Sequence, residues 1–186
     1  MKKLGQRGFT LIELLAVITI MGILMLVAIP AVSRTIENSR RDTFADIAHE
    51  YINAVRNNVL ADNISCKVGS DTMVASATPT GTYYFAIDTA TDGTKDLMES
   101  GGKSPFGNAE MKGYVKWVKL ADDTTGKTTT KYSMVLTDSG KHGFDTETAE
   151  ADIKRSAVKT KLTSAQVTAP TTAGTGTTLY GPCTLS

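Results

Sequence analysis

Hydrophobic residues are unevenly distributed along this chain of 186 residues. Residues 9–32 are apolar almost without interruption, whereas the rest of the chain is rich in Thr, Gly, Asp and Lys. A run of about 20 apolar residues is long enough to cross a bilayer as a helix. Lys2, Lys3 and Arg7 precede the run and should remain on the cytoplasmic side, so the chain after Val32 is predicted to face outward.

The helix is predicted to continue to about Asn63, now with a polar face. Apolar residues recur at helical spacing in this stretch, and acidic and basic residues fill the other positions. The apolar positions are Ile36, Phe44, Ile47, Tyr51, Val55 and Val59. We interpret this stripe as the seam on which a globular domain rests. Arg34, Arg40 and Arg41 are interpreted as a solvated face or as contacts between subunits, in preference to a DNA-binding site.

The remainder of the chain predicts an α+β fold with a small antiparallel sheet. Thr82–Ile87 is rich in β-forming residues, and Tyr114–Leu120 alternates apolar and basic residues as a half-buried strand does. A turn at residues 122–127 should bring Thr130–Thr137 back as a hairpin partner. From about Ala165 the chain is rich in Thr, Ala, Gly and Pro, which predicts an extended surface tail.

Composition and charge exclude several classes of function. The net charge of +1 argues against a general nucleic-acid-binding protein. Two distant cysteines are too few for a disulfide-dense scaffold and have the wrong spacing for a zinc site. No nucleophile is placed beside His49, on the predicted helix, or His142, in a glycine-rich turn. We interpret both histidines as ordinary polar surface residues and predict that the protein is not an enzyme.

Glu13 is a carboxylate within the apolar run. Its insertion in a membrane costs a few kcal/mol, so it needs a partner. It either reaches back to the lipid headgroups or pairs with a new α-amino group, which cleavage after Gly8 would create on Phe9. Residues 28–31 (AIPA) loosely resemble the cleavage site of an ordinary secretory signal. The apolar run is long for such a signal, however, and it contains Glu13.

Residues 8–13 (GFTLIE) resemble the prepilin processing motif of type IV pilins and type II secretion pseudopilins. In that family a membrane-embedded aspartyl peptidase cuts after the glycine and methylates the new amino terminus. The resemblance implies cleavage between Gly8 and Phe9, N-methylation of Phe9, and a role for Glu13 in subunit assembly.

Gly22 and Pro30 also match this family, whose helix weakens between two such residues. Pro30 removes a backbone donor and crowds the carbonyl four residues earlier, and Gly22 has a weak helix propensity. Membrane helices tolerate both residues, so they need not have a function. Alternatively, the segment between them partly unwinds when subunits leave the bilayer and stack.

The resemblance also implies the organisation of the whole chain, a pilin fold in which the long helix packs against the sheet. The expected parts are a cleaved leader at 1–8, a transmembrane and filament-core segment at 9–32, an amphipathic segment at 33–63 and a β-rich head at 64–186. The protein is expected to be a structural subunit of a type IV pilus or pilus-like filament. The alternative is a membrane-anchored minor pilin or binding module that acts as an adhesin or DNA receptor.

The same resemblance implies partners and location. The expected partners are other copies of the chain, a prepilin peptidase, a pilus assembly platform with its ATPase, and the membrane at the precursor stage. No specific nucleic acid and no cofactor are expected. The precursor should lie in the cytoplasmic (inner) membrane as a single-pass protein, and the assembled protein at the cell surface.

Cys66 and Cys183 are predicted to form a disulfide. The region after the membrane segment lies outside the cytoplasm, where disulfides persist, and an even pair fits one bond. Closing a loop of this length should stabilise the fold by about 4 kcal/mol in the chain-entropy model. In pilins a disulfide that bounds the C-terminal region is common. The alternative is two free thiols in a reducing compartment.

One stretch weakly resembles a calcium-binding loop. Residues 88–99 match that pattern at its first, fifth, sixth, ninth and twelfth positions, but Ala90 stands where a ligand is expected. The ligands would be Asp88, Asp92, Asp96 and Glu99. Some pseudopilins bind calcium, but a plain acidic turn is the favoured interpretation.

Overall fold

A computed structural model describes most of the chain. The described residues are 9–89, 97–98, 102–121, 127–138, 141–144, 146–162, 170 and 178–186. The chain divides into two compact units, Met1–Ser39 and Arg40–Ser186, which we call the N-terminal unit and the head. The helix α1 begins in the first unit and ends in the second.

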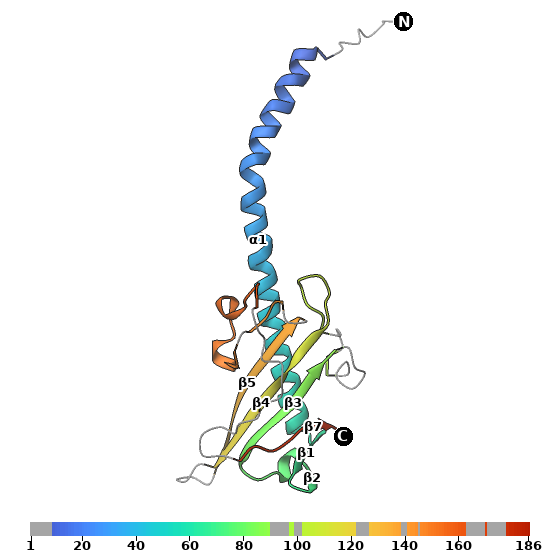
Figure 1. Ribbon diagram of the computed structural model, residues 1–186, viewed down its shortest axis with the longest axis vertical. Helices are drawn as coiled ribbons and strands as arrows, with labels where there is room; N and C mark the ends of the chain where they lie inside the picture. The colour runs from blue at the N-terminus through green and yellow to red at the C-terminus, as the bar shows by residue number, and fades with distance from the viewer. Residues whose placement is uncertain are drawn as a thin grey trace, which may run out of the picture. The chain divides into compact units, whose positions relative to one another are not determined.

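The helix α1 comprises 50 residues from Leu11 to Leu60 (Figure 1). It confirms the single long helix that the sequence predicts, and it ends three residues before the expected limit at Asn63. Leu, Ala, Met, Glu and Arg, which favour helix, recur along its whole length, and Gly22 and Pro30 are the only strong helix breakers between Leu11 and Leu60. Pro30 lies inside the helix.

Asp62 reverses the chain at the end of α1. It has a left-handed backbone (φ 55°), which Asp tolerates better than most residues. The amide of Asn63 donates to the carbonyl of Asn58 at 2.9 Å, and that of Asp62 to Val59 at 3.4 Å, which is the Schellman pattern. The carboxylate of Asp62 accepts a bond from the Ser76 amide at 2.8 Å, and bonding to Ser76 lowers the pKa of Asp62. The end of the helix is therefore fixed to the loop that precedes the long strands.

In the part of the chain that the structure describes, seven strands form one sheet in the order β2-β1-β7-β3-β4-β5-β6 (Figure 1). The three long strands confirm the three predicted ones, each extended by one to three residues at its ends. The two longest strands pair antiparallel over their whole length. The bounds are β1 Ile64–Val68, β2 Asp71–Val74, β3 Gly81–Asp88, β4 Met111–Ala121, β5 Thr128–Asp138, β6 Thr148–Ala149 and β7 Cys183–Leu185.

The end of the chain is extended and is joined to β1 by the predicted disulfide, but it lies inside the sheet and not as a tail on the surface. Its last residues form β7, which lies inside the sheet between β1 and β3 (Figure 1). β7 pairs antiparallel with β1 at three positions, and parallel with β3 where Cys183 faces Phe85. A three-residue strand has too short a pattern to predict from sequence, and its partners lie about 100 residues away. Long-range pairing therefore decides its place.

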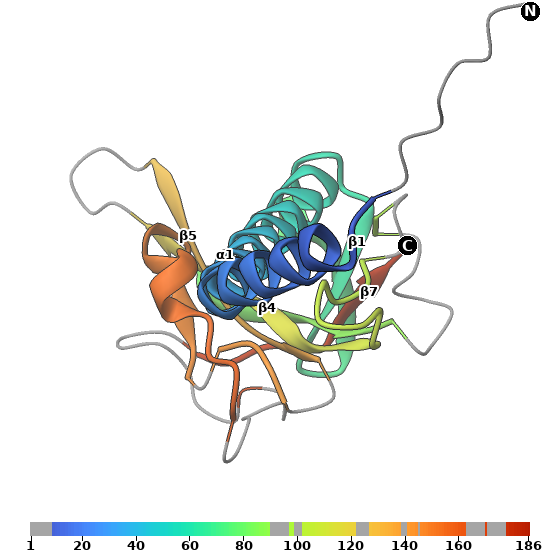
Figure 2. The same ribbon diagram turned by 90° about the horizontal axis from the view of Figure 1, so that it is seen from above.

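The core of the head lies between one face of the sheet and the second half of α1 (Figure 2). Alternate residues of the long strands point to this face, as the pleat requires. The strand residues are Tyr83, Phe85, Ile87, Met111, Val115, Trp117, Tyr132, Met134 and Leu136. The helix residues are Phe44, Ala45, Ala48, Tyr51, Ile52 and Val55. The predicted seam is thus confirmed at Phe44, Tyr51 and Val55, whereas Ile36 is 48% exposed.

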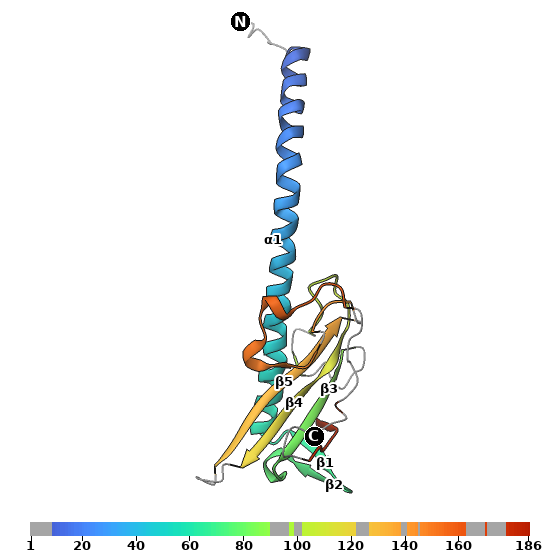
Figure 3. The ribbon, with the colours of Figure 1, turned by 60° about the vertical axis from the view of Figure 1, so that its left-hand side comes forward.

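Residues 148–162, which we call the strap, lie beside α1 (Figure 3). The strap contains two short 3-10 turns, η2 (Glu150–Asp152) and η3 (Arg155–Ala157). Four helix residues hold it, and three of them are spaced seven positions apart and so lie on one face of α1. These three contacts are Asp42 with Arg155, His49 with the carbonyl oxygen of Ile153, and Arg56 with Glu150. Arg41, predicted to be solvated or to contact other subunits, instead donates to the hydroxyl oxygen of Thr160 at 3.3 Å. The interpretation of His49 as an ordinary surface residue is therefore wrong, because its ring is partly buried and bonded to the strap.

Candidate processing and assembly site

Reciprocal hydrogen bonds between Thr10 and Glu13 close the first turn of α1. The amide and hydroxyl of Thr10 donate to Oε2 of Glu13 at 2.8 and 2.9 Å, and the Glu13 amide lies 3.3 Å from the Thr10 hydroxyl oxygen. This is a capping box, which satisfies two amides that have no partner inside the helix. The N-terminal end of the helix dipole also favours a carboxylate at this position. Glu13 thus has a partner within its own chain, which the sequence reasoning missed.

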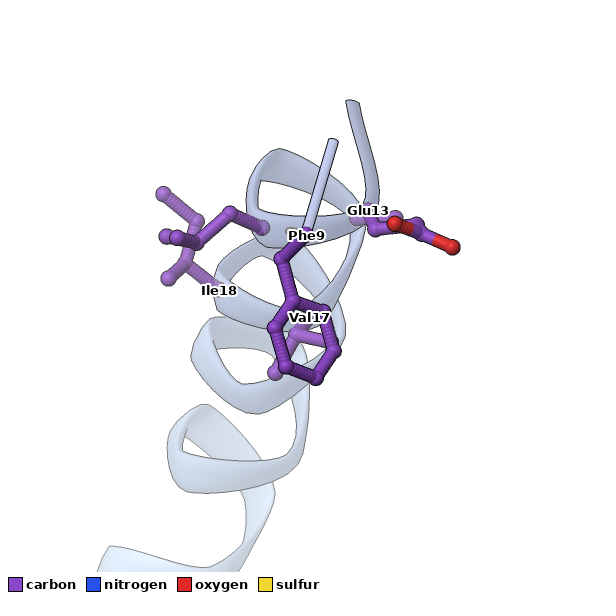
Figure 4. A pocket seen from close by; sticks show the side chains of 6 residues that line it. Phe9, Glu13, Val17 and Ile18 are labelled. Carbon is purple, nitrogen blue, oxygen red and sulfur yellow. The ribbon is translucent and has the colours of Figure 1, made fainter. Parts of the chain in front are cut away.

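Phe9 lies just before the helix and is 90% exposed. Phe9 and Leu14 occupy the two positions of a hydrophobic staple, directly before the cap and four residues into the helix. Both border an open hollow of about 580 Å³ that Glu13 also lines (Figure 4). Figure 4 shows the Glu13 carboxylate pointing away from the Phe9 ring. The first turn therefore presents a charged group beside a strongly apolar recess.

The surface that follows is apolar on every side. All large hydrophobic side chains from Phe9 to Val32 are 53–90% exposed. Among the described residues, α1 is long and apolar enough to cross a membrane, with a mean hydropathy of 2.7 in its most apolar window and none of that window buried. Complete burial of such a side chain contributes about 1.5–3 kcal/mol, and these side chains obtain only part of it within their own chain. This surface is therefore built for a bilayer or for other protein chains.

Gly22 and Pro30, the predicted helix-weakening residues, lie further along α1 than Glu13. Gly8 lies outside the described residues. Gly22 has open space around it, because a Cβ built there would meet nothing within 4 Å. The helix α1 continues through Pro30 without a break.

The predicted disulfide is confirmed, which excludes the alternative of two free thiols. Cys66 on β1 and Cys183 on β7 are bonded, with their Cα atoms 4.0 Å apart. Both residues are buried, at 0% and 2% exposure. The bond closes a separation of 117 residues and joins the start of the sheet to the end of the chain.

The calcium-loop hypothesis falls largely outside the described residues. Asp92, Asp96 and Glu99 are not among them. Asp88 ends β3 and forms an ion pair with Lys112 at 3.2 Å. In the part of the chain that the structure describes, no three His, Cys, Asp or Glu side chains are placed to hold a metal ion.

His142 belongs to a buried polar cluster, so its interpretation as an ordinary surface residue is wrong. The carboxylate of Asp138, 2% exposed, accepts bonds from the Ser104 hydroxyl at 2.8 Å and the His142 amide at 2.6 Å. The His142 ring lies 2.7 Å from the same carboxylate through Nδ1 and stacks on Phe106. A hydrolytic triad would place the imidazole between the serine and the carboxylate. Here the serine bonds the carboxylate directly, so the cluster holds the turn after β5 and has no triad geometry.

One family model, the prokaryotic N-terminal methylation motif, matches residues 3–29. No curated protein and no solved structure matches the chain. The matched segment contains Lys3, Arg7, the capping box and Gly22. The long helix, the mostly antiparallel sheet and the disulfide agree with the pilin fold. The chain therefore carries the N-terminal methylation motif that is the prepilin signal of type IV pilins and pseudopilins, ahead of a head whose architecture agrees with the pilin fold.

Proposed function

We propose that this protein is a structural subunit of a type IV pilus or a pilus-like filament. Glu13 is the observation that carries the proposal, because it places a charge in an otherwise apolar and exposed stretch of helix. A helix that only anchored the head to a membrane would gain a cap from Glu13, but an uncharged Gln can make the same cap without the few kcal/mol that insertion of a charge costs. A helix that packs among identical helices gains a charge that fixes its register.

Processing creates the partner of that charge. A prepilin peptidase cuts between Gly8 and Phe9, and the new amino group of Phe9 is then methylated. Thr10 caps the helix, so Phe9 lies outside the helical hydrogen-bond ladder. The bond to be cut therefore adjoins non-helical chain, which a peptidase can engage without unwinding α1.

Assembly then pairs Glu13 with the Phe9 amine of a neighbouring subunit. Both capping bonds from Thr10 use Oε2 of Glu13, and no described residue donates to Oε1. The second carboxylate oxygen is thus available to an incoming amine while the cap stays in place. In the water-free core of a filament such a pair attracts strongly, and removing one partner leaves a buried charge that costs several kcal/mol.

The segment from Gly22 to Pro30 has a separate role in this proposal. Pro30 has no amide hydrogen, so the carbonyl of Leu26 lacks its usual helical partner. The open space at Gly22 leaves room for a side chain of a neighbouring helix. The segment partly unwinds when the subunit leaves the bilayer, and α1 then fits the packing of the filament.

The experiment compares three variants, each expressed without wild-type protein. Glu13→Ala removes the charge and its half of the cap, Glu13→Gln keeps a capping acceptor without the charge, and Thr10→Ala weakens the cap and keeps the charge. Both Glu13 variants should be processed and should accumulate in the membrane, while their yield in sheared filaments collapses. Thr10→Ala should still assemble. Intact mass should show N-methylated Phe9 as the first residue in every variant.

Normal filaments from Glu13→Ala alone would overturn charge pairing and support the anchored minor pilin or binding module. Normal filaments from Glu13→Gln with none from Glu13→Ala would assign the role to the cap. Surface protein that retains Met1, or that begins near Ala31, would contradict the processing step.

A further inference from the structure

The last nine residues of the chain, 178–186, complete the sheet of the head, and we call them the closing strand. In the described sheet β1 and β3 are not neighbours, because β7 lies between them (Figure 1). The closing strand exchanges backbone hydrogen bonds with both sides. Toward β3, Thr82 bonds Thr178 and Tyr180, each at 2.8 Å. Toward β1, Lys67 bonds Gly181 at 3.0 Å and Pro182 at 3.3 Å.

We call the space between β1 and β3, which the closing strand fills, the cleft. The side chains around it favour the sequence of the closing strand. The Tyr180 ring stacks on Tyr83 at 5.4 Å, and Tyr83 stacks on Trp117 at 5.6 Å. Gly81 leaves room for the Tyr180 ring, since a Cβ there would lie 2.5 Å from it. Gly181 has a positive φ of 132°, and a Cβ there would lie 2.8 Å from the Tyr84 ring. The sequence Tyr180-Gly181 therefore fits this position. A side chain at Gly81 or at Gly181 would clash with a tyrosine ring.

Without the closing strand the sheet would consist of two separate parts. One part would be β2 and β1, and the other β3 to β6, each with an unpaired edge next to the core. Unpaired strand edges accept an extended chain by backbone hydrogen bonding, and a terminal segment is the simplest one to exchange between copies. Fifteen residues, 163–177, connect the closing strand to the strap. Such a length spans up to about 50 Å when extended, so the tether does not confine the strand to its own head.

We propose that the cleft between β1 and β3 is a strand-binding site that a second copy of this chain can fill with its own closing strand. The Cys66–Cys183 bond then locks whichever strand is in place. In the arrangement described here the chain fills its own cleft, and both sulfurs are buried. When the chain's own strand docks first, an external disulfide compound accepts the two electrons of the Cys66 and Cys183 thiols by thiol–disulfide exchange, and the new bond closes the site to other copies. When strands swap between copies before this reaction, the same step yields two heads joined by a disulfide between chains.

The first test uses the full-length Cys183→Ser protein in detergent micelles, which keeps a free thiol at Cys66. The probe is a peptide of residues 178–186 whose cysteine carries a thiopyridyl disulfide. The Cys66 thiolate attacks the peptide sulfur, the new Cys66–Cys183 bond forms, and thiopyridone leaves with the electron pair of the broken bond. Thiopyridone release gives the rate and intact mass identifies the adduct.

The native peptide should label Cys66 faster than a scrambled peptide of the same composition. A peptide with Tyr180→Ala should react about tenfold more slowly, because it loses the ring stack and its buried area. Adding Tyr180→Ala to the acceptor protein weakens its own strand and should speed labelling by the native peptide. The double variant Cys66→Ser, Cys183→Ser and oxidised wild-type protein should release no thiopyridone, because neither has a free thiol. Reduced wild-type protein, with the labelled cysteine located by peptide mapping, is a second acceptor in case Cys183→Ser folds poorly.

The second test mixes two full-length chains. Cys66→Ser carries the thiopyridyl group on Cys183, and Cys183→Ser offers the free Cys66. Peptide mapping should find Cys66 of one chain bonded to Cys183 of the other. Equal labelling by native and scrambled peptides in both acceptors, or no linked pair of full-length chains, would overturn the proposal and leave β7 as a strand of its own head only.

Discussion

The two halves of α1 contain similar apolar residues but differ in what surrounds them. In the head, Phe44, Ile52 and Val55 are fully buried against the sheet. In the N-terminal unit, Ile18 and Ile23 are 54% and 68% exposed. A helix gains most of its stability in water from packing of its apolar face. The second half finds that packing within its own chain, whereas the first half must find it in a bilayer or in other subunits.

Charged residues differ between the halves in the same way. Residues 9–32 carry one charged side chain, Glu13, which bonds only to Thr10 among the described residues. The second half places Asp42 and Arg56 where the strap meets them. The charged side chains in the second half of α1 thus find their partners within the same head. The charge in the first half caps its own helix, and in the proposed filament it also pairs with the Phe9 amine of a neighbouring subunit.

The largest expected effect comes from the same substitution in each half. Ile52→Ala leaves a cavity in the core of the head and should lower its free energy of unfolding by about 2–5 kcal/mol. Ile23→Ala, its matched control, should change that quantity by less than about 0.5 kcal/mol. Urea unfolding in detergent micelles, followed by the fluorescence of Trp117, measures both. Equal losses would mean that the two halves do not differ as described.

A smaller effect is expected at Arg56, which links α1 to both the strap and the sheet. Its guanidinium lies 4.6 Å from the centre of the Tyr132 ring and bonds both carboxylate oxygens of Glu150 at 2.5 Å. Arg56→Ala should lower the free energy of unfolding by about 1–2 kcal/mol, because a cation–π contact and a half-buried ion pair are lost together.

Two control variants sharpen the Arg56 prediction. Arg56→Lys keeps the charge without the planar fork and should recover part of the loss. Arg34→Ala, in the exposed half of the helix, should leave the unfolding of the head unchanged. Equal stability of Arg56→Ala and wild type would show that other contacts hold the strap.

The sequence predicts the long elements of this fold because their patterns are long. The apolar run and the alternation along β4 each extend over enough residues to be distinguished from chance. β7 has three residues, and its position depends on Cys66 and on strands far away in the chain. The strap has no regular pattern, and the contact between His49 and the Ile153 carbonyl spans 104 positions. Local patterns carry no information on such pairings.

The sequence contains a signal for one part of the candidate site and none for the cluster around His142. The Thr-x-x-Glu spacing of Thr10 and Glu13 is a recognised capping signal. Reasoning that treats Glu13 only as a charge in need of an ionic partner does not use this signal. His142 is different, because its role depends on the Asp138 carboxylate. That carboxylate is buried by the fold and also bonded by Ser104, which is far from it in the chain. No spacing in the sequence indicates that cluster.

The smallest effect, and the one that depends on pH, concerns the exposed pair of Asp42 and Arg155. Nε and a terminal nitrogen of Arg155 donate to the two carboxylate oxygens of Asp42 at 2.6 and 2.5 Å. Hydrogen bonding to Arg155 is the main reason that the pKa of Asp42 is lowered in the folded head. The unfolded chain then binds the proton more readily than the folded chain does. The pair therefore stabilises the head above the ordinary aspartate pKa of about 3.9, and this contribution is lost as the pH falls through the lower folded value.

Asp42→Asn should consequently be slightly less stable than wild type at neutral pH, and the two should converge in acid. Urea midpoints of both proteins, measured from neutral pH to below the aspartate range, test this. The neutral-pH difference should shrink in high salt, because both side chains are about half exposed and their attraction is screened. Asp46→Asn, an exposed carboxylate one turn further along α1, is the matched control. A difference that persists in acid would mean that Asp42 holds the strap by packing and not by charge.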